Sequence, residues 1–379
     1  MTAENLEGSL AGHFSTLEDP RDASKRRHKL IDMVVIAIAA VICGADDWVG
    51  VAAFGRAKET WFRQFLELPN GIPAHDTFGR VFSLLAPGAF EQCFRAWVTS
   101  IRQVLPGEIV AIDGKTVRRS HDRAAGLAPL HLVSAWATAN RVVLGQVATE
   151  AKSNEITAIP KVLEMLELKG CIVTIDAMGC QKTIVEKVVE RGGDYVLALK
   201  GNQSTLAQAV EELFIDADAA DYAGWSVDTH ETIDRGHGRV ETRRYFTLTA
   251  VDKIPQAADW AKLNMVGMVQ SERQVNGKTT LEYRFYIGSI GADAQRFAWA
   301  VRNHWGIENR LHWCLDIAFR EDESRIRDRQ AANNFAVLRH IAVNVLKKDT
   351  TIKGGLQTKR LVAGWNEDYL AQLLFQRGA

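Results

Sequence analysis

The stretch EIVAIDGKTVRRS, residues 108–120, runs through apolar residues into Asp113 and continues with glycine, lysine and arginine. The stretch VTIDAMG, residues 173–179, repeats the pattern, because an apolar run again ends in Ile-Asp before a small residue. Short apolar runs of this kind predict buried β-strands. If the two strands are neighbours, Asp113 and Asp176 face each other at one edge of a sheet, where α/β folds collect ligands.

Two carboxylates at such an edge repel each other unless a proton or a cation lies between them. The pattern therefore favours a cation site. The alternative is that Asp113 and Asp176 are unrelated strand-end residues that cap the turns after them.

The remaining sequence indicates a mixed α/β fold with helices at both ends. Three consecutive strand patterns after residue 108 are followed by alternating strands and helices, which is typical of a sheet with antiparallel and parallel parts. We expect five segments: a helical N-terminal domain (1–105, a candidate for DNA-end binding), the first part of a catalytic core (106–214), a β-rich insertion (215–291), the helical second part of the core (292–348) and a C-terminal tail (349–379).

The length and composition of the chain restrict the classes of function that it can have. A chain of 379 residues usually forms more than one domain. Its 46 basic and 46 acidic residues cancel, so nucleic-acid affinity has to come from local clusters. The N-terminus lacks the pattern of a signal peptide, and the apolar run Met33–Ala45 is too short to cross a bilayer, so we expect a cytoplasmic protein. The five cysteines include no C-x-x-C pair.

A third carboxylate lies on a predicted helix near residue 308. Steps of four and three place His304 and Glu308 on an otherwise apolar stripe, and a core-facing carboxylate needs a partner. Glu308 is the candidate third ligand beside Asp113 and Asp176, and such a set suits Mg²⁺ or Mn²⁺. Two alternatives remain, a buried Glu308 paired with His304 or an arginine, and a zinc stripe of His304, Glu308 and His312. The stripe comprises Phe297, Val301, His304, Glu308, Leu311, Leu315 and Ala318.

Several separated sequence motifs resemble those of one known family. AIDGKTVRRS, TIDAMGCQ, LKGNQ, DRGHGRVETRR and NHWGIENRLHWCLDIAFREDESRIR occur in the order found in bacterial insertion-sequence DDE transposases, in the group that includes the H-repeat-associated proteins. The resemblance spans almost the whole chain. It implies an RNase H-like mixed sheet with flanking helices, a β-rich insertion and an all-α N-terminal domain.

The resemblance also implies a site and a reaction. Asp113, Asp176 and Glu308 become the metal-binding catalytic triad, with two Mg²⁺ or Mn²⁺ ions. A related signature, Tyr-x2-Arg-x3-Glu-x6-Lys, is absent here, since Val301, His304 and Leu315 stand at its Tyr, Arg and Lys positions. The implied protein binds the ends of its own element, cleaves phosphodiester bonds, and joins a 3′-hydroxyl to target DNA, as a homodimer when ends are paired. The alternatives are a metal-dependent nuclease without strand transfer and a non-catalytic DNA-binding remnant.

Basic and polar residues near these motifs are candidate DNA contacts, although solvated surface charge explains several of them equally well. A nucleotide-binding P-loop is not indicated by DGKT, because Ile109 stands where that motif needs its first glycine. The densest basic run comprises Arg21, Lys25, Arg26, Arg27 and Lys29. The candidate contacts are Lys115, Arg118, Arg119, Lys200, Asn202, Gln203, Arg235, His237, Arg239, Arg302, His304 and Arg310.

Overall fold

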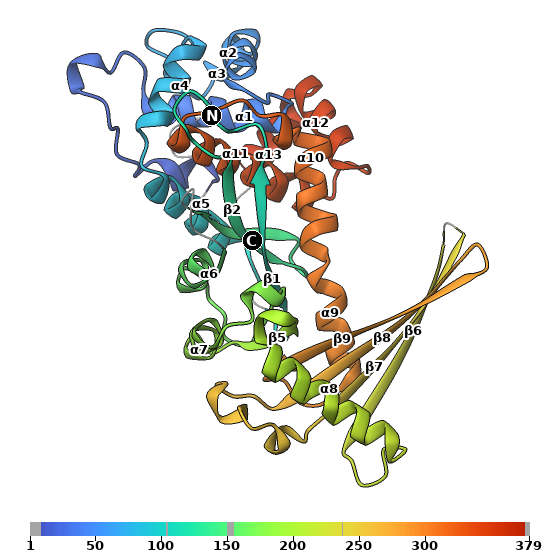
Figure 1. Ribbon diagram of the computed structural model, residues 1–379. Coiled ribbons are helices and arrows are strands. Elements are labelled where there is room, and N and C mark those ends of the chain that lie inside the picture. Colours follow the sequence, from blue (N-terminus) through green and yellow to red (C-terminus); the bar gives the residue numbers. More distant parts are fainter. Residues whose placement is uncertain (1–8, 104, 150–154, 237, 376–379) are drawn as a thin grey trace. The chain divides into compact units, whose positions relative to one another are not determined.

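The computed structural model describes residues 9–103, 105–149, 155–236 and 238–375 (Figure 1). The chain forms two compact units. The first unit comprises Met1–Gln103, Gly114–Ser153 and Glu308–Ala379, and the second comprises Val104–Asp113 and Asn154–Ile307. Within the described ranges, no helix is both long and apolar enough to cross a membrane.

The strands form a large mixed sheet in the order β3-β2-β1-β4-β5-β9-β8-β7-β6. The pairs β1–β4 and β4–β5 are parallel, whereas β2–β3 and all pairs from β5–β9 outward to β6 are antiparallel. The mixed α/β fold with flanking helices predicted from the sequence is confirmed. The strands are β1 (Ile109–Val117), β2 (Leu130–Ala137), β3 (Val142–Thr149), β4 (Ile172–Ile175), β5 (Asp194–Leu199), β6 (Val227–Gly236), β7 (Arg239–Leu248), β8 (Met265–Val275) and β9 (Lys278–Gly288).

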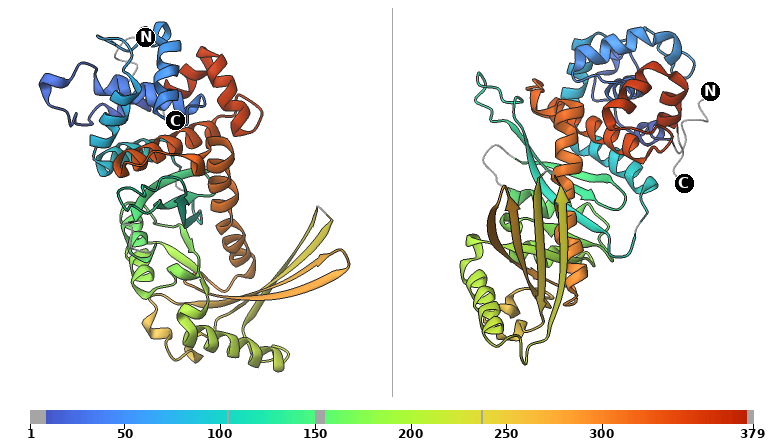
Figure 2. Two further views of the ribbon diagram at one scale, coloured as in Figure 1. Left: turned by 45° about the horizontal axis from the view of Figure 1, so that its top comes forward. Right: turned by 90° about the vertical axis from the view of Figure 1, so that its right-hand side faces the viewer.

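In the second unit, the segment predicted as a β-rich insertion forms two long hairpins, β6–β7 and β8–β9, which run side by side (Figure 2). They continue the sheet, since β9 pairs with β5. Helix α9 packs on β4, β5, β6 and β7, and its Phe297 lies in a core with Ile109, Ile172 and Tyr245. The helices of this unit are α6 (Glu155–Glu164), α7 (Lys182–Glu190), α8 (Ser204–Ala219) and α9 (Ala294–His304).

In the first unit, the N-terminal helices share a core with the C-terminal ones. Helix α11 packs on α1, α4, α5 and β3. The buried Asn334 amide donates to the carbonyls of Phe82 and Leu85 at 2.9 Å, and the Asn344 amide bonds both backbone groups of Val143. The helices are α1 (Leu30–Ile42), α2 (Trp48–Ala57), α3 (Glu59–Phe62), α4 (His75–Leu84), α5 (Pro87–Ile101), α10 (Trp313–Phe319), α11 (Arg329–Lys348), α12 (Leu356–Trp365) and α13 (Glu367–Phe375).

The predicted helical stripe is interrupted. Helix α9 ends at His304, and a π-helix, η8 (Glu308–His312), precedes α10. A π-turn uses i→i+5 hydrogen bonds, so the four-and-three spacing no longer describes which side chains share a face. Leu311 is buried but Glu308 is exposed. The expectation that Glu308 lies on a core-facing stripe is therefore wrong.

Candidate active site on β1 and β4

Asp113 and Asp176 occupy neighbouring positions in the sheet. The parallel register pairs Ile109 with Ile172 and continues to Ile112 with Ile175, so Asp113 comes next within β1 and Asp176 comes next after the end of β4. The expectation that Asp113 ends its strand is wrong, because β1 continues past it to Val117 beside β2. Adjacent strands lie about 4.8 Å apart, and side chains at one register position point to the same face. The predicted side-by-side arrangement of the two Ile-Asp strands is confirmed, and both aspartates are only half-buried.

The Asp176 carboxylate is held by the turn that follows it. Its Oδ1 accepts the amide N–H groups of Met178 at 3.0 Å and Gly179 at 3.3 Å. Asp176 thereby caps the short helix η4 (Ala177–Gly179), as the capping alternative anticipated. Within the described part of the chain, Oδ2 accepts no hydrogen bond. Capping thus uses one oxygen and leaves the other for a ligand.

His304 lies against β4 at the end of α9. Its Nδ1 is 3.2 Å from the Oγ1 of Thr174, which is buried two residues before Asp176. Burial lowers the pKa of His304, although nearby Asp176 acts to raise it. A half-buried imidazole bonded to Thr174 contributes to the structure of the site, so its predicted contact with DNA remains a prediction.

Two side chains of the LKGNQ segment, residues 199–203, form hydrogen bonds to the turn that follows Asp176. The Asn202 side chain donates from Nδ2 to the carbonyl of Ala177 at 2.7 Å, and the Gln203 side chain donates from Nε2 to the carbonyl of Cys180 at 3.0 Å. Asn202 and Lys200 are both exposed, and Gln203 is half-buried. All three residues are candidate DNA contacts by sequence, and the bonds of Asn202 and Gln203 to this turn were not predictable, because hydrogen bonds between two loops leave no spacing signal in the sequence.

Glu308 begins η8 in the first unit and is exposed. Across the described ranges, no group of three or more His, Cys, Asp or Glu side chains lies together as a metal site. Carboxylate oxygens nevertheless suit a hard divalent cation. Within the described ranges, Oδ2 of Asp176 accepts no hydrogen bond, so it is the oxygen that could bind such a cation. The third-ligand role of Glu308 remains a prediction.

Lys115 has three acidic partners in the first unit. Its Nζ lies 2.7 Å from Asp316, 3.0 Å from Glu321 and 3.3 Å from Asp322. Burial acts to lower the pKa of Lys115, but these carboxylates, Glu321 foremost, outweigh it and raise the pKa. Arg118 also pairs with Asp322, at 3.1 Å. These acids stand more than 200 residues downstream, so their pairing with Lys115 leaves no local signal in the sequence.

The other candidate DNA contacts are spread over both units. Arg302 pairs with Asp234 at 3.1 Å, whereas His237 lies outside the described residues. The remaining candidates are exposed, with the first two at the tip of the β6–β7 hairpin: Arg235, Arg239, Arg119 and Arg310.

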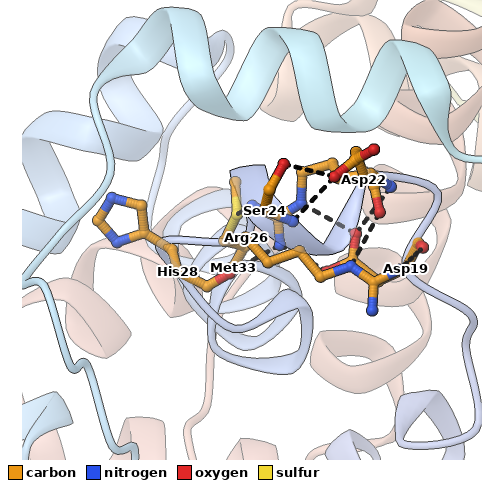
Figure 3. A network of polar contacts seen from close by, with 7 residues as sticks. Asp19, Asp22, Ser24, Arg26, His28 and Met33 are labelled. Atoms are coloured by element: carbon orange, nitrogen blue, oxygen red, sulfur yellow. Dashed lines mark hydrogen bonds and ion pairs between the residues drawn. The ribbon is translucent and has the colours of Figure 1, made fainter.

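The basic run at residues 21–29 is partly neutralised by its own neighbours. The guanidinium of Arg21 pairs with Asp19 at 2.7 Å and donates to the carbonyl of His28. Asp22 accepts hydrogen bonds from Ser24, and Arg26 donates to the backbone of Asp19 at 3.0 Å (Figure 3). Intramolecular contacts therefore use part of the positive charge of this run.

The fold and the site together define a class of protein: a mixed α/β protein in which two neighbouring parallel strands carry aspartates at adjacent register positions. Residues 105–345 match the family model described as "Transposase DDE domain", and residues 11–98 match the model described as "DDE_Tnp_1-associated". The chain belongs to the transposase DDE domain family.

Curated relatives are similar along nearly the whole chain. "H repeat-associated putative transposase YhhI" of Escherichia coli K12 is 39% identical over 97% of this chain and 98% of its own. "Putative transposase YncI" of Escherichia coli O157:H7 is 42% identical over 97% and 94%, and "Putative protein YbfL" of strain K12 is 40% identical over 97% and 98%. The predicted resemblance to transposases of the H-repeat group is confirmed.

Proposed function

We propose that this chain is a DDE transposase that binds the ends of its element, cleaves DNA with divalent metal ions and joins the cut 3′-hydroxyl to target DNA. Asp113, Asp176 and Glu308 form its catalytic triad. The single observation that carries the proposal is the parallel register, since Asp113 and Asp176 directly follow the paired residues Ile112 and Ile175 on adjacent strands.

The strand order supports an RNase H-like core. Three strands in the order β3-β2-β1 are followed outward by β4 and β5, both parallel to their inner neighbours. Asp176 then follows the carboxyl end of β4, where open α/β sheets bind ligands, and Asp113 is at the neighbouring register position on β1. Family membership supports the same reading, because the matching family model is a transposase domain.

The residues fit divalent cations. Asp113 and Asp176 supply oxygen ligands, which Mg²⁺ and Mn²⁺ prefer, and Glu308 supplies the third carboxylate. When bound, such ions activate a water or hydroxyl nucleophile and stabilise the leaving oxygen of the phosphodiester. The turn at Met178 and Gly179 fixes the orientation of one ligand, since it holds Asp176 Oδ1.

DNA is the proposed substrate and partner. Exposed cations on the β6–β7 hairpin tip and on η8, such as Arg235, Arg239 and Arg310, are proposed phosphate contacts. Pairing of two element ends is proposed to require a homodimer. The name of the relative YhhI, a putative transposase, supports this substrate class.

The test is cleavage of a plasmid that carries the gene with its natural flanks, in Mg²⁺ or Mn²⁺. Asp113→Asn, Asp176→Asn and Glu308→Gln each remove a metal-binding charge, so we expect each to lower cleavage about 1,000-fold or more, because metal stabilisation of the transition state is worth several kcal/mol. DNA binding, measured by gel shift, should stay within a few-fold. Asp252→Asn, at an exposed position of the second unit, is the matched control.

Each outcome has a distinct meaning. Retained cleavage in one variant removes that residue from the triad. Metal-dependent cleavage without joined products supports a nuclease that lacks strand transfer. Binding to the flanks without any cleavage by the wild type supports a DNA-binding remnant.

A further inference from the structure

We propose that Asn202 and Gln203 are positioning residues that clamp the turn carrying Asp176 and thereby set the orientation of its carboxylate toward a divalent cation. This inference rests on the proposed function, because it concerns the same metal site. It assigns to the LKGNQ segment a task other than contact with DNA.

The hydrogen bonds bracket the turn. Asn202 donates to the carbonyl of Ala177 at 2.7 Å, and Gln203 donates to the carbonyl of Cys180 at 3.0 Å. Between these two carbonyls lie Met178 and Gly179, whose amides hold Asp176 Oδ1. Both donors come from η5 (Gly201–Gln203), which follows β5, the strand paired with β4. The clamp therefore links the turns after two adjacent strands.

Packing restrains the other side of the turn. A Cβ placed on Gly179 would lie 2.2 Å from Cγ2 of Ile175, so the turn lies directly on the last residue of β4. Ala177 and Cys180 are buried, with exposed fractions of 5% and 0%. A turn with its interior packed on β4 and its carbonyls bonded to η5 has little freedom to move, so Asp176 Oδ2 keeps one direction.

The same bonds separate this role from DNA contact. Each side-chain amide already donates to a backbone carbonyl of the turn, and although Asn202 is exposed like Lys200, only Lys200 carries a charge. A neutral amide bonded within the protein contributes little to backbone affinity, which cations dominate. We therefore expect loss of the two amides to lower the affinity for the metal ion. We expect Lys200→Met to lower the affinity for DNA.

The experiment uses the full-length protein with Asn202→Leu and Gln203→Met, which keep side-chain size and add no charge. Gln208→Met is the matched control, because Gln208 is exposed on α8 and its side chain donates to Glu212. Titration with Mn²⁺, monitored by electron paramagnetic resonance, measures the affinity of each protein for Mn²⁺. We expect about fivefold weaker Mn²⁺ binding for each clamp variant, the factor for one lost net hydrogen bond, and no change for the control.

Two further measurements distinguish positioning from simple stabilisation. Cleavage by the clamp variants should fall in kcat with little change in KM for DNA, and excess Mn²⁺ should restore the rate. Hydrogen exchange of the metal-free protein should be faster at the amides of Met178 and Gly179 and unchanged in α8.

Unchanged Mn²⁺ affinity in both clamp variants, or weaker DNA binding in its place, overturns the inference. A lower rate that excess Mn²⁺ does not restore overturns it as well. If the wild type itself neither binds Mn²⁺ through Asp113 and Asp176 nor cleaves DNA, the proposed function fails. Exchange at Met178 and Gly179 then still decides the clamp, since unchanged protection contradicts it and lost protection supports it.

Discussion

Glu91 is a buried residue of α5 in the first unit. Its Oε1 accepts the amide of Gln146 at 2.9 Å, and Oε2 has no hydrogen-bond partner among the described residues. Burial raises the pKa of Glu91 to about 8, against smaller opposing effects of the Gln146 amide and Arg95. The folded protein therefore keeps a proton that the unfolded chain releases near its ordinary pKa of 4.5.

The raised pKa predicts a pH-dependent stability. Between about pH 4.5 and 8 the folded state holds one more proton, so the free energy of unfolding falls as pH rises, by up to about 1.4 kcal/mol per pH unit, and levels off above pH 8. Glu91→Gln should remove this contribution and be more stable than the wild type at pH 8–9. Urea unfolding across pH measures it, with exposed Glu18→Gln as control. Parallel pH curves for Glu91→Gln and wild type would contradict it.

At the scale of elements, α9 rests on the sheet above a glycine. A Cβ on Gly267 of β8 would lie 2.6 Å from Cζ of Phe297. The Phe297 ring is fully buried, with its centroid 6.1 Å from that of Tyr245 and 5.2 Å from that of Tyr286, so it has no room to retreat. The absence of a side chain at Gly267 is what lets α9 approach the sheet.

Gly267→Ala should therefore lower the free energy of unfolding by about 1–3 kcal/mol, the usual cost of overpacking a core. Gly291→Ala is the matched control, because a Cβ there meets nothing within 4 Å, and it should change stability by less than about 0.5 kcal/mol. Chemical denaturation of both variants provides the measurement. Equal free energies of unfolding for Gly267→Ala and Gly291→Ala would contradict the prediction, because they would show that α9 can move away from the sheet without loss of stability.

Elements were predicted best where their pattern is local. The apolar runs before Asp113 and Asp176 indicated two strands, and the repeated Ile-Asp indicated that they are neighbours, which the register confirms. The exposure of Glu308 was not predictable, because a π-helix follows from tertiary packing rather than from periodicity. The clamp by Asn202 and the acidic partners of Lys115 were missed for a related reason, since contacts between distant segments leave no mark in either segment alone.

At the scale of the whole molecule, the first unit is assembled from both ends of the chain. Helix α1 is buried on all sides, with exposed fractions of 0–1% from Met33 to Ile42. A helix that is apolar all round needs cover on every face. For α1 that cover comes from α2 and from two C-terminal helices, α11 and α12. Trp48 of α2 likewise packs edge-on against Phe335 of α11, with ring centroids 4.8 Å apart.

This assembly predicts that residues 1–105, the segment proposed from the sequence as an N-terminal domain, do not fold alone. Without α11 and α12, each large apolar side chain of α1 that becomes exposed forfeits about 1.5–3 kcal/mol, and a few such losses exceed the stability of a small domain. Circular dichroism of the fragment should show reduced helicity and no cooperative melting, and co-expression with residues 308–379 should recover part of both. Cooperative melting of the fragment alone would instead support an independent N-terminal domain. The core of that domain would then be complete without the contacts of α11.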